Sequence, residues 1–132
     1  MKSVEPRWIG VLETLAIHSR LLSIHGGVPG LRDRGLLESA LVRPRQHAAC
    51  GTRPSIPEMA ALYTAGIVRN HPFVDGNKRV GFLIGGLFLE INGFEFYAEE
   101  ADSTQAVFGL ASGALTEFHY TEWMKAHSRR KR

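Results

Sequence analysis

The chain has 132 residues, of which 44% are hydrophobic and 22% are charged, and its formal net charge is +3. This length and this apolar fraction predict one folded domain over residues 1–132 and exclude a disordered chain. The single cysteine, Cys50, excludes an internal disulfide framework and every cysteine-rich zinc site, as expected for a protein of the reducing cytoplasm.

The N-terminal segment predicts one amphipathic helix. It carries an early acidic residue and no long apolar stretch, so we expect no signal peptide. Trp8 and Leu15 belong to a set of apolar residues that recur at helical spacing, which predicts a helix over about residues 5–24. Gly26 and Gly27 are expected to end this helix, because glycine readily adopts the backbone that follows a helix end.

Two further helices are expected in the first half of the chain. Asp33 is a good N-cap for a helix that runs to about Val42. Pro44 is expected to close that helix, because proline lacks the backbone N–H that a helix interior requires. Ser55, with a glutamate three residues later, forms a capping box for the next helix, which we expect over residues 56–70.

The fourth predicted helix is apolar on nearly every face. It runs from about Asn77 to Asn92, and its apolar character predicts that it is the central helix of the core. Three glycines within it, Gly81, Gly85 and Gly86, lower helix propensity by about 1 kcal/mol each relative to alanine. We therefore interpret them as sites where neighbouring helices approach closely. The apolar run is shorter than the roughly 20 residues of a membrane span, so no membrane contact is expected.

The rest of the chain predicts a short strand at residues 94–97 and helices over about residues 100–113 and 120–128. Four cations follow at residues 129–132, and we predict that they form a disordered basic tail. Without them the formal net charge would fall from +3 to −1, so direct nucleic-acid binding is not expected. The fold class that follows is an all-α domain of six helices.

The most informative segment is the loop His71-Pro72-Phe73-Val74-Asp75-Gly76-Asn77-Lys78-Arg79, which leads directly into the fourth helix. The free amides and the positive dipole end of a helix N-terminus form a site for anions. Lys78 and Arg79 add two positive charges there. His71 offers a proton acceptor, and Asp75 can hold a divalent cation. This combination favours chemistry on phosphate groups.

This loop and its setting resemble the Fic/Doc superfamily, whose core signature is H-x-F-x-(D/E)-x-N-(G/K)-R between two helices. Lys78 stands where AMP-transferring Fic enzymes usually have glycine, which resembles the Doc, or death-on-curing, branch. The runs 25–33 and 35–41 are similar to the N-terminal segment of that branch, and Arg69-Asn70 before His71 also fits. The resemblance covers nearly the whole chain and implies a single Fic/Doc-like domain.

The resemblance implies a role for each position of the loop. His71 would be the general base that takes the proton of an acceptor hydroxyl, and Asp75 would bind Mg²⁺. Lys78 and Arg79 would clamp the phosphates of ATP, the phosphate donor. The lysine of the Doc branch implies that the γ-phosphate faces the acceptor. The remaining predicted positions are Arg69, Gly76 and Asn77 as phosphate-binding residues, and Phe73 as the core anchor of the loop.

The Doc-like interpretation implies a toxin that phosphorylates a serine or threonine hydroxyl of a cytoplasmic protein. For the prototype of the family this target is elongation factor Tu, so the implied effect is blocked translation. Self-inhibited Fic proteins carry an inhibitory helix with a glutamate followed by glycine or asparagine, and no glutamate of this chain has that neighbour. The resemblance therefore implies a separate, Phd-like antitoxin whose C-terminal segment folds into a groove beside the site.

Two alternatives stay open. Transfer of AMP or another nucleotide to a protein hydroxyl, as in Fic enzymes, would need a glycine before Arg79 and a second arginine three residues after it. Lys78 and Phe82 occupy those positions. The other alternative is a catalytically silent binding module, with the high pI reflecting contact with nucleic acid. The intact catalytic positions of the motif argue against that module.

Residues outside the motif are given structural roles. The loop that holds Arg32 and Asp33 could border the site, with Asp33 as the helix cap. The remaining histidines show no spacing that would place them with a second metal ligand, and we interpret them as structural or surface residues: His18, His25, His47, His119 and His127.

Overall fold

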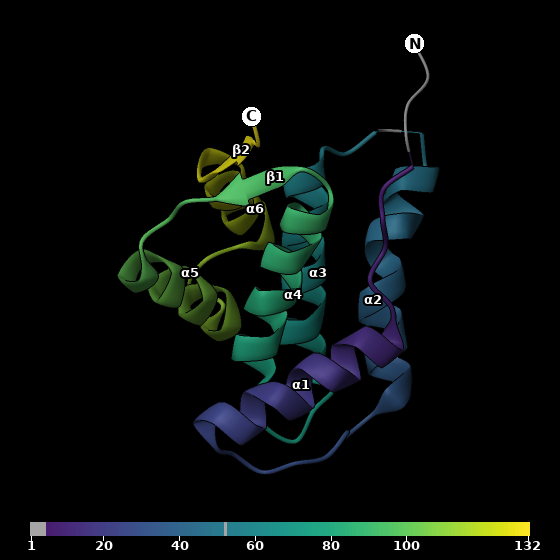
Figure 1. The fold of residues 1–132 in the computed structure, drawn as a ribbon, viewed down its shortest axis with the longest axis vertical. Helices are drawn as coiled ribbons and strands as arrows, with labels where there is room; N and C mark the ends of the chain where they lie inside the picture. The colour runs from purple at the N-terminus through teal and green to yellow at the C-terminus, as the bar shows by residue number, and fades with distance from the viewer. Residues whose placement is uncertain (1–4, 52) are drawn as a thin grey trace.

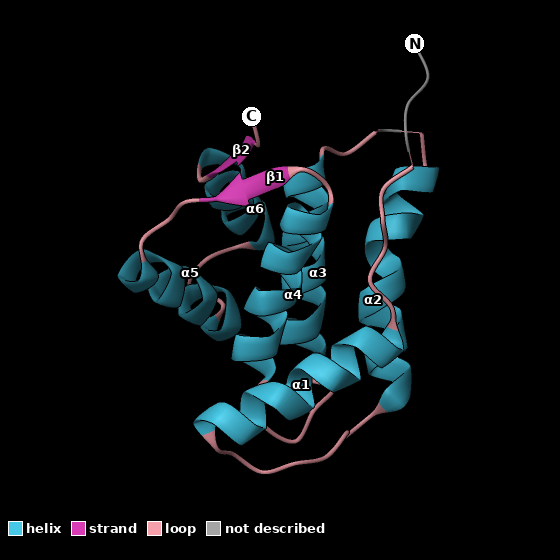
Figure 2. Cartoon of the chain, viewed as in Figure 1, coloured by secondary structure: helices cyan, strands magenta, loops and turns pink. Residues whose placement is uncertain are grey.

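The computed structural model describes residues 5–51 and 53–132. Within this part of the chain, six helices and one two-stranded sheet form the fold (Figures 1 and 2). The expected all-α class is thereby confirmed. Residues 1–4, the first part of the N-terminal segment in which no signal peptide is expected, lie outside the described residues. In chain order the elements are α1 (Val11–His25), α2 (Arg34–Ala49), α3 (Ile56–Asn70), α4 (Asn77–Ile91), β1 (Phe94–Phe96), α5 (Glu100–Ser112), α6 (Glu117–Ala126) and β2 (Ser128–Arg130).

Helices α3 and α4 lie side by side at the centre of the molecule (Figure 1). The fourth helix was predicted to be the central one, but α3 shares that position and is the more completely buried of the two. Residues 59–68 of α3 are all buried, whereas Leu83 on the outer face of α4 is 42% exposed. α2, α4, α5 and α6 all pack against α3. The small side chains of Ala60, Ala61 and Ala65 allow neighbours to approach it closely from several sides.

Glycines of α4 permit this close approach. A Cβ atom at Gly85 would overlap Oγ1 of Thr64, and one at Gly81 would lie 3.1 Å from Cγ2 of Val68. A Cβ atom at Gly86 would meet nothing within 4 Å. The interpretation of close-approach sites therefore holds for Gly81 and Gly85 and is wrong for Gly86.

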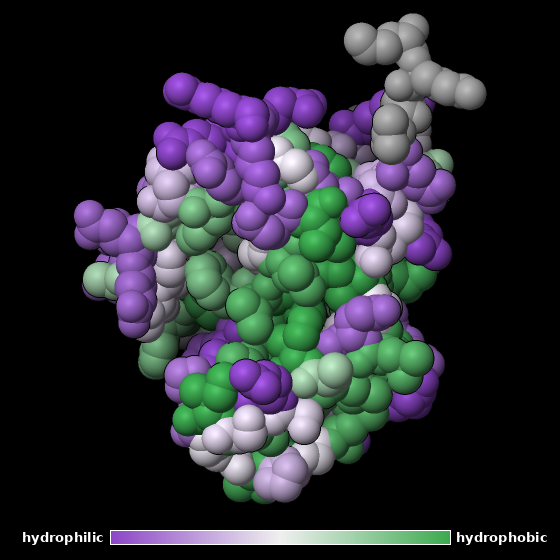
Figure 3. Space-filling view, viewed as in Figure 1, coloured by the Kyte–Doolittle hydropathy of each residue, from purple (hydrophilic) through white to green (hydrophobic). Residues whose placement is uncertain are grey.

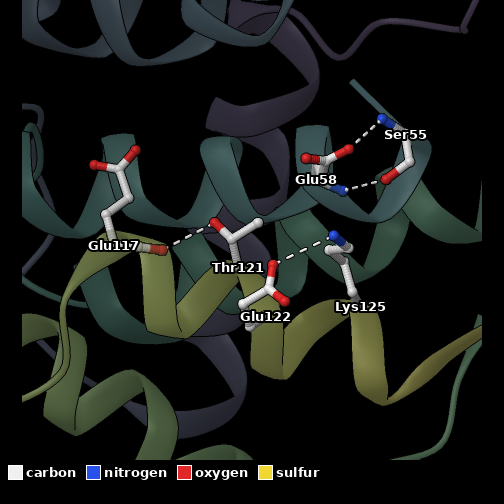
Figure 4. A network of polar contacts seen from close by, with 6 residues as sticks. All are labelled: Ser55, Glu58, Glu117, Thr121, Glu122 and Lys125. Atoms are coloured by element: carbon white, nitrogen blue, oxygen red, sulfur yellow. Dashed lines mark hydrogen bonds and ion pairs between the residues drawn. The ribbon is translucent and has the colours of Figure 1, made fainter. Parts of the chain in front are cut away.

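The start of α3 follows the predicted capping box, shown beside α6 in Figure 4. The backbone N–H of Ser55 donates to Oε1 of Glu58 at 2.8 Å, and the N–H of Glu58 donates to Oγ of Ser55 at 3.2 Å. The hydrogen bond from the Ser55 backbone holds the pKa of Glu58 below its usual value, and the charge of Lys125 on α6 acts in the same direction. The N-terminus of α3 is therefore satisfied within the fold.

The first helix is shorter than predicted. α1 begins at Val11 and not near residue 5, because Gly10 is its N-cap and donates its N–H to Oε1 of Glu13 at 2.9 Å. Residues 5–9 form no helix or strand (Figure 1). Among them, Ile9 is buried and donates its N–H to the hydroxyl of Tyr63 on α3 at 3.0 Å. Residues 5–9, called the N-terminal strap below, therefore attach the N-terminal region to the core.

The second helix is longer than predicted. It passes through Pro44 and ends at Ala49, although proline removes one helical hydrogen bond. Pro44 itself is buried, and the residues beyond it pack against the rest of the molecule. The guanidinium of Arg45 lies 5.2 Å from the ring centroid of Trp8, and Ala48 packs against the core. These contacts offset the missing bond.

The C-terminal residues are ordered by a second strand. β1 and β2 pair antiparallel, with Glu95 opposite Arg129. The prediction of a disordered tail at residues 129–132 is therefore wrong for Arg129 and Arg130, which belong to β2. Arg129 forms an ion pair with Glu95 at 2.6 Å, and Lys131 forms one with Glu90 at 2.6 Å. The open edge of β1 supplies backbone partners that the sequence alone does not reveal.

The surface facing the viewer in Figure 3 carries an apolar band over α4, below hydrophilic side chains that cover β1 and β2. Leu83 on α4 and Leu12 on α1 are both exposed, at 42% and 77%. In residues 5–51 and 53–132, no helix has the length and apolar character needed to cross a membrane.

Candidate active site

The loop of the sequence motif, called the motif loop below, connects α3 to α4 through residues 71–76. Two of its residues have a left-handed backbone. His71 ends α3 with φ 51° and ψ 54°, and Gly76 begins α4 with φ 81°. A left-handed backbone is strained for a residue with a side chain, so the surrounding contacts must hold His71 in place. One such contact is the hydrogen bond that the N–H of His71 donates to the carbonyl of Ile67 at 3.0 Å.

Asn77 closes the loop from the inside. Its Oδ1 accepts the N–H of Phe73 at 3.0 Å, and its Nδ2 donates to the carbonyl of Phe73 at 2.9 Å. The Asn77 side chain is buried, so these bonds are shielded from water. Because Gly76 is the N-cap of α4, Asn77 fixes the loop and does not cap the helix.

A second loop, residues 28–33, holds the motif loop from the outside. The N–H groups of Arg32 and Asp33 both donate to the carbonyl of Pro72, at 2.6 and 3.0 Å. The N–H of Val74 donates to the carbonyl of Gly30 at 3.0 Å. Asp33 also caps α2 as predicted. The two loops therefore form one unit, although they are far apart in the sequence.

The side chain of Arg32 reaches the end of α3. Its Nε donates to the carbonyl of His71 at 2.7 Å, and its Nη2 donates to the carbonyl of Asn70 at 2.9 Å. The guanidinium thus holds both peptide groups that flank the left-handed turn. The sequence suggested only that this residue could border the site, and no spacing signal indicates these contacts.

His18 on α1 supports the same loop from the core. Its ring stacks on Phe73 with 3.7 Å between the centroids and 11° between the planes, and Phe73 is 1% exposed. Nε2 of His18 lies 2.8 Å from the carbonyl oxygen of Asp75. Because a carbonyl only accepts, Nε2 carries the proton in this contact. The expected structural role of His18 is therefore a role in placing the motif loop.

A cavity of about 860 Å³ opens between the motif loop, β1 and α5. Its apolar lining includes Val68, Phe82 and Phe96. Phe73 is buried next to His18 and does not line the cavity. Arg69 is exposed and does not line the cavity either, so the phosphate contact of Arg69 stays a prediction. The cavity brings together six of the predicted site positions: His71, Asp75, Gly76, Asn77, Lys78 and Arg79.

The wall opposite the motif loop is formed by α5. Glu100, Thr104 and Phe108 line it, and Phe108 is 61% exposed. Nζ of Lys78 lies 5.6 Å from the ring centroid of Phe108, which is a cation–π contact. Sequence reasoning missed this wall. The only available signal is that Thr104, Phe108 and Ala111 share one helix face, and that spacing is equally typical of any amphipathic helix.

The carboxylate of Asp75 is exposed and is held by two backbone donors. Oδ2 accepts the N–H of Val28 at 3.0 Å, and Oδ1 accepts the N–H of Gly76 at 2.9 Å. The bond from Val28, followed by that from Gly76, lowers the pKa of Asp75, and the charge of Arg79 acts in the same direction. The group therefore stays ionised well into acidic pH.

This carboxylate fits a magnesium ion that is shared with a phosphate ligand. Each oxygen of Asp75 accepts one hydrogen bond and keeps a further lone pair. Among the residues that the structure describes, no group of three or more histidine, cysteine or acidic side chains could enclose a metal. Mg²⁺ does not need such a group, because it binds through one or two carboxylates, water and substrate phosphates.

Comparison with known proteins matches this sequence, including the motif loop, to one family. Residues 8–89 match the model of the Fic/DOC family, and this span contains the motif loop. The chain is 30% identical over 110 residues to the protein kinase Doc of Escherichia phage P1. The aligned residues cover 83% of this chain and 86% of that protein. It is 37% identical over 75 residues to the toxin Doc of Mycolicibacterium smegmatis, which covers 56% of this chain and 58% of that protein.

Proposed function

The chain belongs to the Fic/DOC family, and we propose that it is a Doc-like toxin that phosphorylates a protein. The donor is Mg·ATP, and the acceptor is a serine or threonine hydroxyl of a cytoplasmic target. The observation that carries the proposal is the convergence of His71, Asp75, Lys78 and Arg79 on one cavity at the N-terminus of α4. The name of the phage relative, protein kinase Doc, agrees with transfer of phosphate.

The proposed reaction transfers the terminal phosphoryl group of ATP. His71 takes the proton of the acceptor hydroxyl, and the freed oxygen forms a bond to the γ-phosphorus. The bond between that phosphorus and the bridging oxygen breaks, and ADP leaves. Lys78, Arg79 and the amides at the start of α4 stabilise the negative charge on the phosphates. Asp75 would hold Mg²⁺, which would supply further positive charge against the phosphate oxygens.

The lining of the cavity supports phosphate transfer over AMP transfer. A Fic-type AMP-transferase would place a second arginine three residues after Arg79. That position is Phe82, which lines the cavity as an apolar group. Lys78 occupies the place of the glycine that such enzymes carry. The start of α4 therefore presents two cations and an aromatic wall to the nucleotide.

We further propose elongation factor Tu as the target and a Phd-like antitoxin as the partner. The name toxin Doc of the mycobacterial relative supports a toxin–antitoxin pair. A C-terminal antitoxin segment that folds on binding needs apolar surface to bury. The exposed side chains of Leu83 and Leu12 supply such surface, and so does the apolar band over α4 in Figure 3.

The decisive experiment is intact-mass spectrometry of purified elongation factor Tu after incubation with this protein, Mg²⁺ and ATP. We expect the mass of one phosphate to be added by the unmodified protein and not by the variant His71→Ala. The matched control is His47→Ala, because His47 is an exposed histidine on α2 that does not line the cavity. This control should phosphorylate as fast as the parent.

Each other outcome excludes part of the proposal. An adduct of the mass of AMP would assign the chain to nucleotidyl transfer in spite of Lys78. Phosphate on a different protein of a cell lysate, with none on elongation factor Tu, would keep the activity and reject the target. No ATP turnover with any protein would favour the catalytically silent binding module.

A further inference from the structure

A second hollow, of about 520 Å³, lies away from the candidate active site. It is lined by the strap that precedes α1, the end of α2, the start of α3 and both strands, and it shares no lining residue with the first cavity. Three arginines from three separate parts of the chain line it: Arg45 on α2, Arg53 before α3 and Arg130 on β2. The fold therefore gathers cations that the sequence distributes.

The charge of this hollow is not balanced by the residues around it. Glu5 is the one carboxylate among the described residues that line the hollow, and its Oε1 accepts the indole N–H of Trp8 at 3.1 Å. None of the three arginines forms an ion pair with another residue that the structure describes. Like charges that converge without counter-ions repel one another, and an anionic ligand would relieve that repulsion.

Two of these arginines are held in place by aromatic rings. The guanidinium of Arg45 lies 5.2 Å from the ring centroid of Trp8, and that of Arg130 lies 5.1 Å from the ring centroid of Phe94. Stacking uses the flat face of a guanidinium and leaves the N–H donors at its edge free. Both groups are thus ordered before a ligand arrives, which lowers the entropic cost of binding.

We propose that this hollow is a binding site for phosphate esters, separate from the ATP site. A phosphate group suits three guanidinium groups better than a carboxylate does, because it offers more oxygen acceptors and can carry more charge. A hollow of this size also holds more than the phosphate itself. The phosphate can belong to a single-stranded nucleic acid or to a free phosphate ester, and both present the same chemistry to the arginines.

The test is a fluorescence-anisotropy titration of the whole protein with a labelled single-stranded RNA, over a series of salt concentrations. Inorganic phosphate is titrated in parallel, with the indole N–H signal of Trp8 followed by NMR. The double variant R45Q/R130Q should bind the RNA at least about 10-fold more weakly. Its salt slope should be shallower by about 1.4, since each lost phosphate contact on a single strand accounts for about 0.7.

Matched variants separate the site from general charge. Arg20→Gln removes one charge from an exposed position of α1, as Arg53→Gln removes one charge from the hollow, and it should leave binding within about 2-fold, because RNA affinity depends mainly on the phosphates contacted. Arg53→Gln, at a residue in the loop before α3, gives a second loss variant that leaves both stacked pairs intact. Glu5→Gln should tighten binding, because it removes the opposing charge.

Each outcome either supports the proposal or overturns it. RNA binding that is lost in the arginine variants and kept in Arg20→Gln supports the site and assigns it to a nucleic-acid strand. A shift of the Trp8 signal with phosphate alone, lost in the same variants, supports it and assigns it to a small phosphate ester. If neither probe binds, or if R45Q/R130Q binds as Arg20→Gln does, the proposal is wrong. None of these results depends on kinase activity.

Discussion

Arg32 holds the backbone on both sides of the turn that carries the candidate general base. Its guanidinium donates to the carbonyls of Asn70 and His71, at 2.9 and 2.7 Å. Without it, the strained left-handed residue loses two of its constraints, and the imidazole can shift. A displacement of 1 Å at a catalytic group can lower the rate about 10²-fold. We predict that Arg32→Ala lowers kcat by about that factor with little change in KM for ATP, measured by steady-state kinetics.

Two variants make this prediction specific. Arg32→Lys keeps the charge but has no planar fork, so it should recover only part of the lost kcat. Arg34→Ala removes a neighbouring exposed arginine whose partner is Glu38, and it should retain the activity of the parent. A rise in KM with unchanged kcat in Arg32→Ala would contradict a positioning role.

Asp75 is kept ionised by the backbone of two loops. The N–H groups of Val28 and Gly76 lower its pKa below the usual 3.8, so the folded state holds its proton less tightly than the unfolded state. The stabilisation that results is complete above pH 3.8 and is lost as the pH falls through the folded pKa. We predict a midpoint below 3.8 for the Asp75 carboxyl carbon in an NMR titration.

The variant Asp75→Asn checks the link to stability. It removes the titrating group, so its free energy of unfolding should fall less steeply between neutral and acidic pH than that of the parent. An Asp75 midpoint at or above 3.8 would mean that the two backbone bonds do not form in solution.

At the scale of elements, the contact between α3 and α4 depends on a glycine that the chain cannot replace. A Cβ atom at Gly85 would overlap Oγ1 of Thr64 and lie 3.0 Å from the carbonyl oxygen of Ala60. We predict that Gly85→Ala lowers the free energy of unfolding by about 1–3 kcal/mol, because overpacking outweighs the gain in helix propensity. Chemical denaturation measures this difference.

Gly86 is the matched control on the next position of the same helix. An added Cβ would meet nothing within 4 Å there, so the substitution changes stability only through the higher helix propensity of alanine. Gly86→Ala should therefore raise the free energy of unfolding by about 0.5–1 kcal/mol. If both alanine variants changed stability in the same direction, the close approach at Gly85 would not be what sets the packing of these helices.

Elements defined by local signals were predictable from the sequence. The bounds of α3 followed from the capping box at Ser55 and from Pro72, which disfavours helix at the preceding residue. Elements that depend on residues far away in the sequence could not be predicted. α2 continues past Pro44, where the guanidinium of Arg45 lies 5.2 Å from the ring centroid of Trp8, and no local pattern indicates that contact. The strand β2 exists because β1 offers it a pairing edge.

The same distinction applies to the candidate site. His71, Asp75, Lys78 and Arg79 lie within nine consecutive residues, in the loop before α4 and in its first turn, so their meeting in one cavity could be expected from their spacing. The groups that shape the site come from other elements. Arg32 precedes α2, and the wall of α5 follows far along the chain, so only the tertiary fold brings them to the loop.

At the scale of the whole molecule, two buried tyrosines have opposite hydrogen-bonding situations. The hydroxyl of Tyr63 accepts the N–H of Ile9 at 3.0 Å and so ties the N-terminal strap to α3. The hydroxyl of Tyr120 on α6 is buried without a partner among the described residues. Thr64 lies close to it, and the Thr64 hydroxyl donates to the carbonyl of Gly81 at 2.8 Å.

We therefore predict opposite effects of phenylalanine at neutral pH. Tyr63→Phe leaves the N–H of Ile9 buried and unpaired, which should lower the free energy of unfolding by about 1–3 kcal/mol. Tyr120→Phe removes an unpaired polar group and should leave stability unchanged or raise it. Urea denaturation of the two variants and the parent at pH 7 measures both signs. A loss in Tyr120→Phe as large as that in Tyr63→Phe would show that the Tyr120 hydroxyl has a partner.

The same two side chains should make the fold sensitive to alkali. Burial raises the pKa of both phenols above the usual 10.0, so the unfolded chain releases these protons first. Above that pH the folded state binds more protons, and the free energy of unfolding falls as the pH rises. Each tyrosine adds a slope of up to about 1.4 kcal/mol per pH unit. Each phenylalanine variant should lose stability less steeply than the parent above pH 10, and the double variant least steeply of all. An unchanged slope in Tyr120→Phe would mean that this phenol ionises equally in the folded and unfolded states.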